Sequence, residues 1–196
     1  MYMELSHKLI TFLKKNLFIT LQEGRTLGMN EMTFSRFVTE GKLYRVERGI
    51  YARNIDWLTD PLKKYCIACT RFKGAVICGI SALSYYELTD EEEKNIWVAL
   101  PQLRTLKNPR YRFIRPQGIS YKLGIEKYIF GRRNVRIYDR EKTIVDAFKY
   151  LNEEVALKAL KGYLKNSDKN ISQLCNYARK LKKPLDDIIT VLLADE

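Results

Sequence analysis

The chain has 196 residues, of which 46% are hydrophobic and 12% aromatic, so it can bury the core of a globular protein. Its formal charge of +12 excludes an acidic, solvating composition and favours a polyanionic partner. No stretch reaches the roughly 18 apolar residues of a membrane span, and no basic-then-apolar leader opens the chain, so we expect a cytoplasmic protein without membrane contact.

The first elements along the chain are short helices with recognisable ends. Apolar residues recur at helical spacing over about residues 4–16, which predicts an amphipathic helix. Thr20, with Glu23 three residues later, predicts a capping box at the start of a second helix. Gly28 can adopt the positive φ that a sharp turn often needs, and Asn30 is a good cap for a third helix.

A β-hairpin is predicted directly after the third helix. Phe34 and Phe37 should face the core, and residues 43–46 and 50–52 read as two strands joined by a tight turn. Helix, turn, helix and hairpin in this order are typical of a winged helix-turn-helix, which lays one helix in the DNA major groove. We therefore expect a DNA-binding domain over residues 1–57.

The candidate DNA contacts are the polar start and outer face of the third helix and the cations of the hairpin. Cations at these places would lie near phosphates. The set is Asn30, Glu31, Met32, Thr33, Ser35, Arg36, Lys42, Arg45, Arg48 and Arg53. A winged helix can also bind protein, and this interaction-module alternative stays open.

A second basic region lies outside the winged helix. Residues 104–140 hold 11 cations against Glu126 and Asp139 only, and aromatic residues alternate with these cations in strand-like stretches. A second phosphate-binding surface is therefore expected, with a solvated charged face as the alternative. Its members are Arg104, Lys107, Arg110, Arg112, Arg115, Lys122, Arg132 and Arg133. Arg110, Arg112, Arg132 and Arg133 in particular are expected to face solvent.

No catalytic, metal or cofactor site is predicted. His7 is the only histidine, and Cys66 and Cys69 lie in a helical pattern where they share a buried face. The acidic run 90–93 reads as a solvated turn, and no glycine-rich phosphate loop is present. An enzyme that acts on nucleic acid, a nuclease or transferase, remains the alternative and would need carboxylates that converge in space.

The second half is predicted as a mixed α/β domain over residues 58–196, with a small sheet and several helices, so the fold class is α+β. A helix over 61–72 precedes a short apolar strand, and Ser81 is expected to cap a helix that runs through Tyr86. The remaining predictions are strands at 96–100, 111–115, 121–123, 126–130 and 135–138, then a helix capped by Asp139 and helices near 155–164, 171–181 and 184–194.

Five strings of the sequence occur in an order found in one known family. They are EGKLYRVERGIYAR, GISALSYYEL, IWVALP, VRIYDREKTIVDAFKY and EEVALKALKGYL. The chain thereby resembles AbiEi-type antitoxins of type IV toxin–antitoxin systems, which serve in abortive infection against phage. Where relatives often carry Ser-His or similar polar residues, this chain has Cys78-Gly79.

The resemblance implies a repressor that binds inverted repeats in double-stranded DNA upstream of its own operon. It further implies a C-terminal domain, containing the DREKTIVDAF helix, that neutralises a nucleotidyltransferase-like toxin without direct contact. We expect a monomer in solution, with pairing on DNA left open, and no enzymatic activity.

Overall fold

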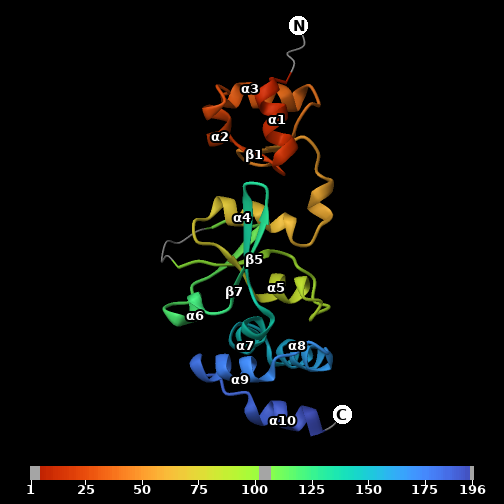
Figure 1. Cartoon of the computed structure of the whole chain (residues 1–196), viewed down its shortest axis with the longest axis vertical. Coiled ribbons are helices and arrows are strands. Elements are labelled where there is room, and N and C mark those ends of the chain that lie inside the picture. The colour runs from red at the N-terminus through yellow and green to blue at the C-terminus, as the bar shows by residue number, and fades with distance from the viewer. Residues whose placement is uncertain (1–4, 102–106, 195–196) are drawn as a thin grey trace. The chain divides into compact units, whose positions relative to one another are not determined.

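The computed structural model describes residues 5–101 and 107–194, which form an α+β protein as predicted (Figure 1). Contacts divide the chain into two compact units. The first comprises Met1–Cys66 together with Ile129–Asn134, and the second comprises Ile67–Tyr128 and Val135–Glu196. The sequence boundary between residues 57 and 58 remains a prediction about which segment folds independently.

Short helices and a small antiparallel sheet make up the first unit. The sheet has the order β1-β3-β2, and β2 carries a bulge between Arg45 and Glu47. The elements are α1 (His7–Lys15), β1 (Ile19–Thr20), α2 (Leu21–Thr26), α3 (Glu31–Thr39), β2 (Tyr44–Glu47), β3 (Ile50–Ala52), η1 (Asp56–Thr59) and η2 (Lys63–Tyr65).

The ends of α2 and α3 form where the sequence predicts them. Thr20 Oγ1 accepts a hydrogen bond from the Glu23 backbone N–H, while the Glu23 carboxylate accepts one from the Thr20 N–H. Gly28 has φ of 81°, and Asn30 Oδ1 accepts from the Thr33 N–H at 2.9 Å. These contacts satisfy helix N–H groups that have no partner inside the helix, so the turn between α2 and α3 is fixed locally.

The core of the first unit joins α2, α3 and the sheet through aromatic side chains. Phe34 and Phe37 are buried, and the Phe34 ring stacks on Tyr51 of β3 with ring centroids 4.5 Å apart. Phe34 also lies directly against Gly24 of α2, where a Cβ atom would come within 2.2 Å of the ring. The absence of a side chain at Gly24 therefore permits the close approach of α2 and α3.

The second unit contains a sheet of five strands among its described residues, in the order β6-β5-β4-β8-β7. Strand β4 is antiparallel to β5 and parallel to β8, and β5 is parallel to β6. The elements are α4 (Cys66–Arg71), β4 (Val76–Ile77), α5 (Gly79–Tyr85), β5 (Ile96–Ala99), β6 (Tyr111–Ile114), α6 (Ile119–Lys122), β7 (Ile125–Phe130), β8 (Arg133–Tyr138), α7 (Arg140–Tyr150), α8 (Glu153–Lys165), α9 (Ile171–Lys180) and α10 (Asp186–Ala194).

Two local predictions in the second unit are wrong. Residues 121–123 were expected as a strand, but the segment belongs largely to the short helix α6, where Tyr121 donates to the Gly74 carbonyl. Ser81 does not cap α5. It lies buried inside that helix and accepts a hydrogen bond from the Trp97 backbone N–H at 2.7 Å. In both places the side chain forms a hydrogen bond to a distant part of the chain, Tyr121 to the Gly74 carbonyl and Ser81 to the Trp97 N–H. The local sequence pattern does not show such a partner.

Candidate nucleic-acid interface

Helix α3 presents a polar outer face, as its pattern predicts. Glu31, Met32 and Ser35 are exposed, and Met32 retains 79% of its accessible surface. Asn30 and Thr33 are engaged at the helix start, because Asn30 Oδ1 accepts from both the N–H and the hydroxyl of Thr33. The outer face therefore offers both hydrogen-bonding groups and an apolar side chain to a partner.

Two candidate cations near the end of α3 share one carboxylate. Arg36 Nε lies 3.2 Å from Glu40 Oε1, and Lys42 Nζ lies 2.8 Å from Glu40 Oε2. The hydrogen bond from Lys42, opposed by partial burial and reinforced by Arg36, holds the pKa of Glu40 below its ordinary value. These cations are thus partly neutralised, which reduces the field that they offer to a phosphate.

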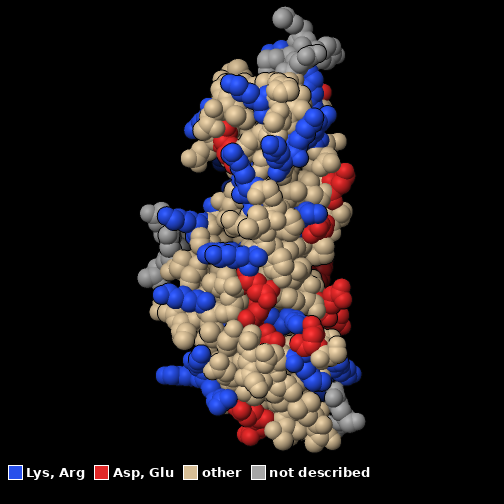
Figure 2. Space-filling model, in the orientation of Figure 1, with Lys and Arg blue, Asp and Glu red and all other residues tan. Residues whose placement is uncertain are grey.

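The hairpin cations face solvent. Arg45, Arg48 and Arg53 are exposed, and none of them forms an ion pair with another described residue. On the face drawn in Figure 2, several Lys and Arg side chains project from the first unit, with fewer acidic groups among them. The hairpin therefore carries positive charge that no described acid neutralises directly.

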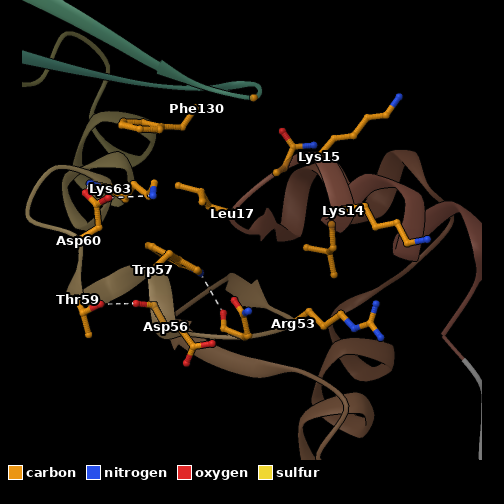
Figure 3. A pocket seen from close by; sticks show the side chains of 14 residues that line it. Lys14, Lys15, Leu17, Arg53, Asp56, Trp57, Thr59, Asp60, Lys63 and Phe130 are labelled. Atoms are coloured by element: carbon orange, nitrogen blue, oxygen red, sulfur yellow. Dashed lines mark hydrogen bonds and ion pairs between the residues drawn. The ribbon is translucent and has the colours of Figure 1, made fainter.

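A groove of about 1060 Å³ lies in the first unit, beyond the end of β3 (Figure 3). Arg53 lines it together with Lys14 and Lys15, while Lys63 and Asp60 pair with each other at 2.9 Å on another part of its wall. Arg53, which the sequence places in the hairpin set, directly follows β3 and also lines this groove beside the cations at the end of α1.

The second basic region is divided between the two units. Arg132 and Arg133 belong to the first unit and the other described members to the second, while Arg104 lies outside the described residues. Lys107, Arg110 and Lys122 are exposed. On the face of the second unit shown in Figure 2, basic and acidic side chains are interspersed.

Two arginines of this region lie over aromatic rings of the second unit. The Arg112 guanidinium is 4.3 Å from the centroid of the Trp97 ring, and that of Arg115 is 5.4 Å from the Phe113 ring. Such stacking leaves the charge in place while fixing part of the side chain. Arg112 is exposed, as expected, whereas Arg115 is only partly so.

The expectation that Arg133 faces solvent is wrong, because its residue retains only 5% of its accessible surface. Its Nη2 donates to the Phe18 carbonyl at 2.8 Å and to Glu23 Oε2 at 2.6 Å. The guanidinium also lies 4.1 Å from the centroid of the Phe18 ring. Arg133 is therefore an internal part of the first unit and is removed from the candidate DNA contacts, whereas Arg132 remains exposed.

Glu23 is the acceptor at the centre of this contact. One oxygen, Oε2, accepts from the N–H and the hydroxyl of Thr20, both at 2.8 Å, as well as from Arg133. Burial opposes ionisation, yet the hydrogen bonds from Arg133 and Thr20 together hold the pKa of Glu23 below its ordinary value. The capping box of α2 is thus extended by a third donor from a distant part of the chain.

Sequence reasoning found neither of the two ion pairs that organise these cations, although it assigned Glu23 to the capping box. The Arg36–Glu40 pair follows the helical i, i+4 spacing and could have been found from that signal. The Glu23–Arg133 pair joins residues 110 positions apart, and no local pattern indicates it.

The DREKTIVDAF segment builds the core of the second unit. Asp139 caps α7 by accepting from the Lys142 N–H at 2.8 Å, and Lys142 pairs with Asp146 in a fully buried position beside the Tyr138 ring. Glu141 accepts from the Tyr163 hydroxyl of α8 at 2.6 Å. The charged residues of this segment thus bind α7 to its neighbours, which accounts for their pattern by packing.

The described residues offer no cluster with the make-up of a metal site. Within 5–101 and 107–194, no three His, Cys, Asp or Glu side chains gather closely enough to hold an ion. Burial raises the pKa of the Cys69 thiol to about 11. At Gly79, a Cβ atom would lie 2.3 Å from the Trp97 ring. None of the helices in the described part is long and apolar enough to cross a membrane.

Comparison with known proteins gives a match to a family model. Residues 7–54 match a family described as transcriptional regulator, AbiEi antitoxin. No curated protein matches the chain. The matched segment contains α1, α2, α3 and the β2–β3 hairpin, the elements that carry the candidate interface. The resemblance to AbiEi-type antitoxins, predicted from the sequence, is thereby confirmed for these residues.

Proposed function

We propose that the protein is a DNA-binding transcriptional regulator whose first unit works as a winged helix-turn-helix. In this proposal α3 is the recognition helix and the β2–β3 hairpin is the wing. The observation that carries it is the exposed polar face of α3 beside hairpin cations, within the segment that matches the AbiEi regulator family. A transcriptional regulator of this family is expected to bind DNA.

The geometry of the first unit supports a division of labour between base and phosphate contacts. Ser35 and Met32 project from α3, where a hydroxyl can hydrogen-bond to a base edge and an apolar side chain can contact a thymine methyl group. Arg45 and Arg48 of the hairpin are free of described ion pairs and suit phosphate contacts. Specific recognition would therefore come from α3, and general affinity from the wing.

The family resemblance extends this proposal to a toxin–antitoxin operon. The protein would repress its own operon by binding inverted repeats and would be a monomer in solution, with pairing on DNA left open. Its second unit would neutralise a nucleotidyltransferase-like toxin without forming a complex with it.

Titration of labelled upstream DNA against a scrambled competitor tests the repressor role. We expect preferential binding of the inverted repeat and a steep salt dependence. A protein that neutralises about 6 phosphates loses roughly a thousandfold in affinity when salt rises from 50 to 200 mM. Equal binding of both DNAs at every salt concentration would contradict sequence-specific repression. Absence of any DNA binding would favour the protein-interaction alternative.

A further inference from the structure

The tip of the β7–β8 hairpin is bound into the helix-turn-helix. Residues 129–134 belong to the first unit, although the rest of both strands belongs to the second. Asn16 Oδ1 accepts from the Arg132 backbone N–H at 3.0 Å, and a Cβ atom at Gly131 would come within 2.1 Å of the Lys15 carbonyl. Gly131 also has φ of 60°, so both the close approach of the Lys15 carbonyl and the backbone conformation require glycine at this position.

Arg133 continues from this tip to the start of α2. Its Nη2 bridges the Phe18 carbonyl and the Glu23 carboxylate, and Glu23 is the residue that closes the capping box. Gly24, the next residue, touches Phe34 of α3. A continuous series of contacts therefore runs from Arg133 through the first turn of α2 to the helix with the candidate DNA-reading face.

A contribution to stability alone does not explain why the Arg133 guanidinium is buried. Its Nε–H is buried without a hydrogen-bond partner in the described part of the chain, and a buried, incompletely satisfied ion is costly to desolvate. Buried polar groups of this kind can instead specify one arrangement among several.

We propose that Arg133 is a positioning residue for DNA recognition, which fixes α2 and thereby α3 through Glu23. The proposal rests on the proposed function, since it assigns the contact a role in DNA binding. It differs from the expectation drawn from charge alone, in which Arg133 itself would touch a phosphate. The two roles have different signatures in the salt dependence of binding.

The decisive variant is Arg133→Gln in the full-length chain, compared with Lys127→Gln as a matched control. Lys127 is an exposed cation on β7 of the same hairpin, so both variants lose one positive charge. We expect Arg133→Gln to weaken operator binding about tenfold with an unchanged salt slope, because hydrogen bonds to charged groups contribute on this scale. Lys127→Gln should retain the native affinity.

A phosphate-contact role predicts another result, namely a salt slope reduced by about 0.9 for the lost contact. That reduction in Arg133→Gln would overturn the positioning role. Arg133→Lys, which keeps a donor for Glu23, should restore part of the affinity. A double-mutant cycle with Glu23→Gln should show that the two losses are not additive, whereas additive losses would contradict a shared contact.

Amide hydrogen exchange without DNA separates this proposal from the function on which it rests. The N–H groups of residues 20–26 should exchange faster in Arg133→Gln than in the native chain, while those of α7 remain protected. Unchanged exchange in α2 would overturn the proposal even if the native protein binds its operator. Faster exchange in a protein that binds no operator would refute the DNA-binding function and leave the contact's structural part intact.

Discussion

Asp139 combines a helix cap with an unfavourably placed charge. It accepts from the Lys142 N–H, from the Tyr177 hydroxyl at 3.1 Å and from the Gln173 amide at 3.4 Å. Burial nevertheless raises the pKa of Asp139 to about 6, and the nearby charge of Glu141 acts in the same direction. The folded second unit therefore binds a proton at this carboxyl more tightly than the unfolded chain does.

This shift predicts a pH dependence of stability. Between the ordinary pKa of 3.8 and the raised value of about 6, the folded state binds more protons, so stability falls as pH rises through that interval and stays lower above it. Asp139→Asn keeps a cap oxygen and should remove this loss. Relative to the native chain, the free energy of unfolding of the variant should be higher at pH 7 than at pH 4 by roughly 1–3 kcal/mol. Urea unfolding across this pH range measures it.

Asp168→Asn is the control of opposite sign. The hydrogen bond from Arg140 lowers the pKa of Asp168, so its contribution is lost as pH falls. A native pH profile for Asp139→Asn would show that the raised pKa of this carboxyl does not govern the stability of the second unit.

At the scale of single elements, the C-terminal end of α3 has a carboxylate that partly neutralises two cations. Glu40, which caps the C-terminal end of α3, holds Arg36 and Lys42 in one cluster of three charges. A phosphate or base that approaches this end must compete with a carboxylate already in contact with both cations. Under the proposed function, Glu40 would lower general attraction to DNA and leave more of the discrimination to the exposed face of the helix.

Arg36→Ala tests whether this side chain reads a base. We expect a loss of about 1–3 kcal/mol on the specific operator and a smaller loss on random DNA, because a base contact contributes only where the base is present. Competitive titration on the two DNAs measures the difference. Arg48→Ala, at the wing tip, should weaken both to the same extent.

Glu40→Gln gives the complementary change, since both cations lose their shared acid. We expect tighter binding to random DNA and a steeper salt slope than in the native chain. An unchanged affinity in Glu40→Gln would show that Arg36 and Lys42 do not face DNA.

For Arg36→Ala, an equal loss on both DNAs would assign Arg36 to a phosphate instead.

At the scale of the whole molecule, the first unit is not continuous in sequence. Ile129–Asn134 completes it, and Arg133 and Gly131 make specific contacts there. A fragment of residues 1–60 would lack this segment, so weak DNA binding by such a fragment would not distinguish a loosened α2 from the loss of a second DNA-binding surface. The role of the basic region is therefore tested in the full-length chain.

The second basic surface predicts a change in salt dependence. Reversal of Lys107, Arg110 and Lys122 to Glu should weaken binding to any DNA sequence and lower the salt slope by up to about 3 if all of them contact phosphates. These side chains are exposed, so the fold should persist, which circular dichroism checks. Native affinity and slope in the reversed protein would leave the first unit as the whole DNA-binding surface.

The sequence by itself determined what depends on neighbours along the chain. The capping box at Thr20, the positive φ of Gly28, the Asn30 cap and the buried pair Phe34 and Phe37 are all as predicted, because hydrogen bonds and periodicity over three or four residues fix them. The Asp139 cap of α7 was found in the same way. The chemical character of the α3 face was therefore readable from the sequence.

Only the tertiary structure decided which cations remain available. Arg133 looks like one more member of a basic run, yet Glu23, which is 110 residues away, removes it from solvent. Ser81 reads as a helix cap, but its hydroxyl oxygen accepts a hydrogen bond from the Trp97 backbone N–H of a neighbouring strand. A count of charges assumes that each faces water, whereas burial and partners across the fold set the free energy of each charge separately.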